Sequence, residues 1–117
     1  MMFLSRLFIA IPMIVFGLFH FMNANGMVPV VPSFIPGGIV WVYFTGAALI
    51  LSGAAILTQV KAYRACLGLA VMIGIFILTI HLPAYLAGDA RALMALLKDL
   101  AVVGGVLALS VLFQDTE

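Results

Sequence analysis

Four side chains that can do chemistry stand inside apolar stretches of this 117-residue sequence: His20, His81, Lys98 and Asp99. Imidazole takes up and releases a proton near neutral pH, ammonium donates hydrogen bonds to carbonyl oxygens, and a carboxylate can relay a proton. A charge near the middle of a bilayer costs at least ~2.5 kcal/mol, so ionisable groups there usually face protein or water and mark a functional site. The four residues therefore predict a ligand-binding site, although no catalytic role can be assigned to any of them.

The segments that carry these residues are long enough to cross a membrane. Hydrophobic residues make up 67% of the chain and charged residues only 8%, far from the composition of a soluble domain. Asp, Glu, Lys and Arg are absent from residues 7–60, 65–88 and 100–114. Because a span needs about 20 residues, we predict helices at 3–22, 39–58, 65–86 and 91–113. The chain, residues 1–117, is expected to form one all-α domain, an integral membrane four-helix bundle.

The basic residues predict the orientation of this bundle. With the N-terminus inside, the cytoplasmic side carries Arg6, Lys61 and Arg64, whereas the opposite side carries Arg91 and the partly submerged Lys98. Cytoplasmic connections of multi-pass proteins are enriched in Lys and Arg. We therefore expect an N-in and C-in topology.

Helix geometry places the polar residues toward one side of the membrane. At 1.5 Å per residue, His20 lies about 21 Å along its helix from Arg6, near the outer end of the first span. His81 lies late in the third span, which runs outward as well. The two imidazoles are thus expected at similar depth.

The fourth span brings its charges to the same half of the bilayer. Asp89 is a good N-cap, and Lys98 and Asp99 lie about 14 Å below it. Thr45, at the outer start of the second span, completes the predicted set. Residues 98 and 99 are turned about 100° apart, so they are expected to meet different neighbours. In a purely structural alternative, Asp99 pairs with Arg91, Lys98 or a histidine only to satisfy buried groups.

The connection between the first two spans, residues 23–38, is uncharged, proline-rich and still apolar. Its three prolines prevent a continuous helix, and non-helical backbone at membrane depth is tolerated where protein covers it or where it lines a cavity. We expect a re-entrant segment that folds over the outer end as a lid. The alternative is an interfacial loop anchored by Phe34 and Trp41.

Small residues and one proline bear on how the helices pack. Small side chains permit close approach of membrane helices. The small residues of this kind in the predicted spans are Gly17, Gly46, Gly53, Gly74 and the pair Ala101–Gly105. Pro83 cannot donate to the carbonyl of Thr79 and is expected to kink or end the third helix near His81.

Several kinds of site are excluded or disfavoured. Cys66 is the single cysteine, so disulfide exchange within one chain is excluded, and there is no zinc-type cluster or phosphate-binding glycine loop. A net charge of +1 gives no basic face for nucleic acid. His20 and His81 suggest haem held between facing helices. A quinone or another polar-headed molecule is favoured over haem because it also accounts for Lys98 and Asp99.

The sequence resembles the DoxX-like membrane proteins over nearly its whole length. The motifs that carry the resemblance are, in order, GLFHF, VPSFIPGG, WVYFTGAALILSG, IHLPAYLAG and LLKDLAVVGG. The family is similar to the small membrane subunit of thiosulfate:quinone oxidoreductases. The resemblance implies a four-helix bundle in a bacterial-type inner membrane and an accessory or quinone-binding role in a membrane redox system.

This resemblance leaves the reaction and the partners open, because one fold hosts many functions. Lipid is an expected partner, and other membrane redox subunits or a homo-oligomer are the alternatives considered. The chain departs from four-helix membrane thiol oxidoreductases, which use paired cysteines. A non-catalytic assembly or chaperone-like membrane protein is the main alternative function, and a b-haem-binding bundle is another.

Overall fold

The computed structural model describes residues 2–27, 29 and 37–114. Within these ranges the chain is helical and contains no strand. The elements are α1 (Met2–Met22), α2 (Ala24–Met27), α3 (Gly38–Thr58), α4 (Ala62–Phe76), the π-helix η2 (Ile77–His81), α5 (Leu82–Leu86), α6 (Ala90–Ser110) and the 3₁₀-helix η3 (Val111–Phe113). Elements α4, η2 and α5 follow one another without a break, as do α6 and η3.

Four helices in the described part of the chain are long and apolar enough to cross a membrane. They are Phe3–Met22, Gly38–Thr58, Ala62–Leu86 and Ala90–Phe113. Large apolar side chains are exposed along them, including Phe8 at 72%, Leu51 at 70% and Met94 at 76%. A soluble monomer rarely exposes so much contiguous apolar surface. The prediction of an all-helical chain with four apolar spans is confirmed, and the third span begins at Ala62 instead of residue 65.

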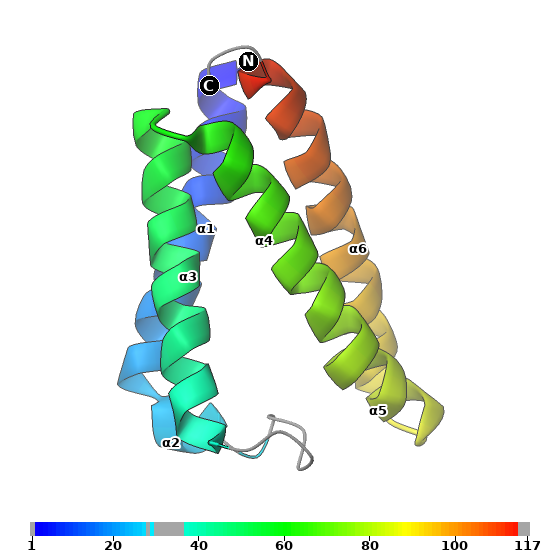
Figure 1. Ribbon diagram of the computed structural model, residues 1–117. Helices are drawn as coiled ribbons and strands as arrows, with labels where there is room; N and C mark the ends of the chain where they lie inside the picture. The colour runs from blue at the N-terminus through cyan, green and yellow to red at the C-terminus, as the bar shows by residue number, and fades with distance from the viewer. Residues whose placement is uncertain (1, 28, 30–36, 115–117) are drawn as a thin grey trace.

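The long helices form two pairs, α1 with α3 and α4 with α6, joined through contacts between α3 and α4. Figure 1 shows the start of α1 and the end of the α6–η3 helix at one end, which we call the proximal end, and α2 and α5 at the other, distal end. In that view the two pairs lie together at the proximal end and diverge toward the distal end.

The α1–α3 pair is held by close backbone approach at three glycines. A Cβ atom placed on Gly17 would lie 2.6 Å from Ile50 Cγ1 and 2.7 Å from the carbonyl oxygen of Gly46. One placed on Gly53 would lie 2.5 Å from Ile14 Cγ1. Such distances exclude any side chain unless the helices move apart, so these glycines fix the spacing of α1 and α3.

The most deeply buried side chains gather toward the proximal end, where the two pairs meet. Ile56 of α3, Cys66 and Leu69 of α4, Val106 of α6 and Phe113 of η3 are all 0–1% exposed and belong to one cluster. Dense packing of this kind gives a helix bundle its fixed geometry. The proximal end is therefore the part of the molecule that holds the two pairs together.

The short connection between α3 and α4 is tight and polar. Gln59 and Lys61 both adopt left-handed backbone conformations, with φ of 60° and 53°. Arg6 of α1 reaches this region and donates from Nη1 to the carbonyl oxygen of Leu57 at 2.9 Å. That carbonyl lies in the last turn of α3, where a positive charge interacts favourably with the helix dipole.

The third span changes its hydrogen-bond pattern before Pro83. Across Ile77–His81 the helix widens to a π-helix, and the N–H of Leu82 donates to the carbonyl oxygen of Ile77, five residues earlier. The helix then continues through α5 to Leu86. The helix therefore does not end at Pro83, and one wide turn precedes the proline.

The ends of α6 and the first connection complete the fold. Asp89 caps α6, as the sequence indicated, and its Oδ1 accepts from the backbone N–H of Arg91 at 3.0 Å. The expected lid, or interfacial loop, falls mainly on residues 28 and 30–36, which lie outside the described residues.

Candidate functional site

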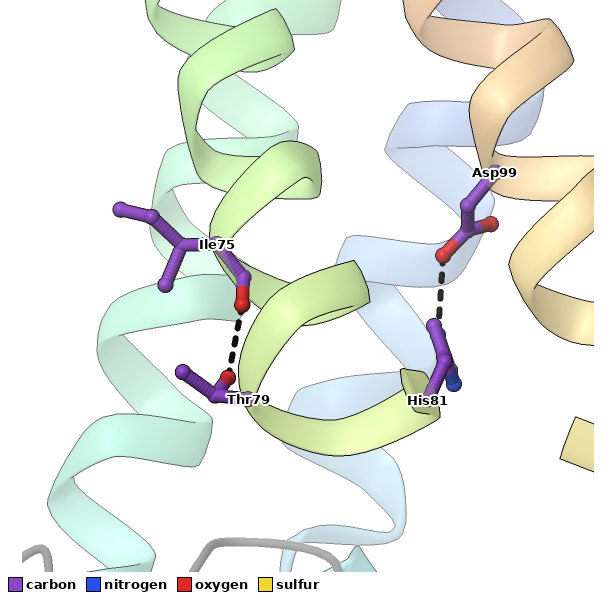
Figure 2. A network of polar contacts seen from close by, with 4 residues as sticks. All are labelled: Ile75, Thr79, His81 and Asp99. Atoms are coloured by element: carbon purple, nitrogen blue, oxygen red, sulfur yellow. Dashed lines mark hydrogen bonds and ion pairs between the residues drawn. The ribbon is translucent and has the colours of Figure 1, made fainter. Parts of the chain in front are cut away.

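His81 and Asp99 form a direct polar contact between the third span and the fourth. Nε2 of His81 lies 2.9 Å from Oδ2 of Asp99, and their side chains are 24% and 18% exposed. Figure 2 shows the imidazole at the end of the π-helix and the carboxylate descending from α6 to meet it. This contact ties α6 to the third span, on the distal side of the buried cluster.

The π-helix is the element that presents His81. Wide turns of this type are rare and are frequently found at functional sites. Thr79, two residues earlier, donates its hydroxyl to the carbonyl oxygen of Ile75 at 2.7 Å, so its polar group is satisfied within its own helix (Figure 2). Of the two polar side chains in this turn, His81 is therefore the one that reaches across to α6.

The contact defines how the imidazole can act. With Asp99 ionised and His81 neutral, the Nε2–H group donates a hydrogen bond to the carboxylate, which leaves Nδ1 as an acceptor. Nδ1 has no hydrogen bond to any described residue, because the Asp99 contact is the one polar contact of His81 there. The pair can therefore orient a ligand hydroxyl or carbonyl and exchange a proton with it.

Lys98 does not join this pair. It is exposed on α6, and among residues 2–27, 29 and 37–114 it makes no hydrogen bond or ion pair. Asp99, one position further along, is turned inward to His81. The two neighbouring charges thus face different surroundings, as their angular separation on a helix requires.

The other two predicted ligand-binding residues lie in the α1–α3 pair. Nδ1 of His20 donates to the carbonyl oxygen of Phe16 at 2.6 Å, one turn earlier in α1. Thr45 is 9% exposed. Its neighbour Gly46 packs so close to α1 that a Cβ there would lie 2.8 Å from His20 Cβ. His20 and His81 have different hydrogen-bond partners, Phe16 and Asp99, so the predicted five-residue site is divided between the two helix pairs.

The described residues contain no group of three or more His, Cys, Asp or Glu side chains placed to hold a metal ion. Cys66 is fully buried in the cluster that joins the two pairs, where it acts as a small packing residue. The described residues therefore add no metal ligand and no accessible thiol to the polar pair, and His81 with Asp99 is the candidate site.

Two structural features were not predicted from the sequence. Arg6 was assigned only to topology, yet it bonds the end of α3. One feature of the sequence could have predicted the π-helix at Ile77–His81, because Pro83 removes a backbone donor just downstream.

Comparisons of the chain with protein-family models, with curated proteins and with solved structures gave no match. The resemblance to DoxX-like proteins stays a prediction.

Proposed function

We propose that this chain is an accessory subunit of a membrane redox system that binds a quinone-like molecule at His81 and Asp99. The observation that carries the proposal is the 2.9 Å contact between Nε2 of His81 and Oδ2 of Asp99 within two apolar spans. Placing a carboxylate and an imidazole there is costly, and function is the usual reason for that cost.

The chemistry of the pair suits a ligand with a polar head and an apolar body. A quinone head presents carbonyl oxygens and its reduced form presents hydroxyls, so Nδ1 of His81 can serve either, as donor when protonated and as acceptor when neutral. The partial exposure of both side chains, 24% and 18%, leaves room for such a contact. Electron transfer would require a donor or acceptor in another subunit, since the pair itself supplies only hydrogen bonds and a proton.

The proposal places the protein in a bacterial-type inner membrane with both termini inside. The support is the resemblance to DoxX-like proteins and the positions of Arg6, Lys61 and Arg64 at the proximal end. Cysteines placed at Lys61 and at the exposed Ala87 test this orientation with an impermeant thiol reagent. Labelling at residue 87 and protection at residue 61 are expected from outside, and the reverse pattern would invert the topology.

Binding tests the site directly. The purified protein in mild detergent is mixed with decylubiquinone or its quinol, and bound ligand is measured by equilibrium dialysis. We expect His81→Gln and Asp99→Asn to weaken binding about 10-fold or more, since one hydrogen bond to a charged group is worth about 1.5–3 kcal/mol. Thr79→Val is the matched control on the same turn, because its hydroxyl is already bonded to Ile75.

The outcome also distinguishes the structural alternative. Both substitutions keep a polar side chain at the contact, so folding should survive while binding falls. If neither decylubiquinone nor its quinol binds the wild-type protein, or if the variants bind them unchanged, the pair serves only to join the helices.

A further inference from the structure

Lys98 poses a separate question, because it is a lysine on the outer face of an apolar helix. It lies about 12 Å from the start of α6 at Ala90. It is exposed and has no polar partner among the described residues. Charged side chains inside membrane spans almost always face a bundle interior, a water-filled cavity or an opposite charge. An ammonium group on this face therefore calls for a partner that lies beyond the described fold.

The face that carries Lys98 has the spacing of a helix-packing seam. Its members recur at alternating intervals of three and four residues and are all exposed: Arg91, Met94, Lys98, Ala101, Gly105 and Ala108. This is the interval at which one helix meets another in knobs-into-holes packing. We call these six residues the α6 seam. In Figure 1, α6 lies at one edge of the molecule.

The proximal half of the α6 seam is shaped for close approach of another helix. A Cβ placed on Gly105 would meet one atom within 4 Å, Ile9 Cδ1 at 3.9 Å. Gly105 and Ala108 also line a groove of about 480 Å³ whose other wall includes Ser5 and Phe8 of α1. Small residues beside such a groove let a neighbouring helix insert a large side chain.

A second copy of this chain does not suit the α6 seam. In a two-fold symmetric membrane dimer the same residues meet at the same depth, so Lys98 would face Lys98 and Arg91 would face Arg91. No Asp or Glu belongs to the seam to offset this repulsion, and Asp99 is already bonded to His81. The charges require an occupant of opposite sign.

We propose that the α6 seam binds a transmembrane helix of a different membrane protein, one that carries an Asp or Glu at the depth of Lys98. The carboxylate pairs with the Lys98 ammonium in the distal half, and an apolar side chain fills the groove at Gly105 and Ala108 in the proximal half. The interface is independent of ligand binding at His81, which lies on the third span and contacts α6 through Asp99, outside the seam.

The test uses a synthetic partner. The full-length protein, labelled at Gln114→Cys with a fluorescence donor, is reconstituted in phosphatidylcholine vesicles with an acceptor-labelled 24-residue Leu/Ala peptide. One peptide carries Asp at the ninth position and its control carries Leu there. From the measured strength of polar contacts between membrane helices, the Asp peptide should associate roughly three- to twentyfold more strongly than the Leu peptide.

Variants then assign the effect to the seam. Lys98→Met should remove the preference for the Asp peptide, Lys98→Arg should retain it, and Lys61→Met, outside the seam, should change nothing. Gly105→Leu should weaken association with both peptides, and a Cβ at this position makes only an ordinary contact, 3.9 Å from Ile9 Cδ1. Circular dichroism confirms the fold of each variant.

Four results would overturn the proposal. The first is equal association of the two peptides with the wild-type protein. The second is a preference that survives Lys98→Met. The third is strong energy transfer between two copies of the chain that Gly105→Leu abolishes, which would assign the seam to self-association. If the preference disappears only when phosphatidylglycerol is present, Lys98 instead binds lipid phosphate, and the proposal fails as well.

Discussion

The α1–α3 pair and the α4–α6 pair are both built from long apolar helices, yet different contacts hold them. In the first pair, glycine backbones touch the partner helix, and a Cβ at Gly17 or Gly53 would collide within 2.6 Å. In the second pair, a Cβ at Gly74 or Gly104 would meet nothing within 4 Å, and a polar contact joins His81 to Asp99. The same residue type thus has a packing role in one pair and leaves open surface in the other. What decides the role of a glycine is the neighbour it faces.

Glycine substitutions should give the largest difference in stability between the two pairs. Gly17→Ala forces atoms apart at the α1–α3 contact and should cost about 1–3 kcal/mol of unfolding free energy, the usual penalty for overpacking. Gly74→Ala meets open space and should be neutral or stabilising by up to about 1 kcal/mol, because alanine favours helix. Unfolding by sodium dodecyl sulfate, followed by circular dichroism, measures both. Equal losses would show that the difference between the pairs is not one of glycine packing.

A double-mutant cycle examines the polar contact of the second pair. His81→Leu and Asp99→Leu each leave the other group without its partner, and the double variant removes both groups. We expect a coupling of about 0.6–1.7 kcal/mol, the range found between membrane helices, with stability recovered in the double variant. Purely additive losses would mean that the contact contributes nothing to holding α6 on the third span.

Arg6 gives the first pair its own polar contact, at the proximal end. Arg6→Met removes the donor to Leu57 and should lower the unfolding free energy by about 1 kcal/mol. Arg6→Lys should lose less, because the charge near the end of α3 remains. Lys61→Met serves as the control, and a similar loss there would point to a general effect of charge at this end.

The connection between the pairs should respond least. Gln59 has a φ of 60°, so Gln59→Gly relieves a strained backbone and should raise the unfolding free energy by about 0.5 kcal/mol. Val60 has no positive φ, and Val60→Gly should instead destabilise. Thermal unfolding of both variants in one detergent decides the sign.

Much of the fold follows from the sequence because lipid imposes a simple requirement. Runs free of charge over about 20 residues predict helices, and four are found. The start of the third span was set too late because Arg64 was treated as a boundary, although a basic side chain in the first turn can reach the polar layer. The cap at Asp89 was predictable from its residue type and position.

The site was less predictable because it depends on which helices are neighbours. The depth of each residue along its helix placed Thr45 and the four ionisable residues at one level of the membrane. Depth does not show which way a helix is rotated or which helix is its neighbour. The structure pairs His81 with Asp99, leaves Lys98 outside, and keeps His20 and Thr45 with the α1–α3 pair. The angular separation of residues 98 and 99 was the one feature of the sequence that indicated this division.

The π-helix also determines where a residue can be deleted from the third span without disturbing the bundle. A wide turn accommodates one residue more than a regular turn, and the helix on either side keeps its register. Deleting Leu78 should therefore leave a regular helix whose flanks still face the same neighbours, whereas deleting Val71 rotates everything beyond it by about 100°. Deletion of Leu78 would remove only the contact between His81 and Asp99. A chain one residue shorter there could keep the bundle without the site.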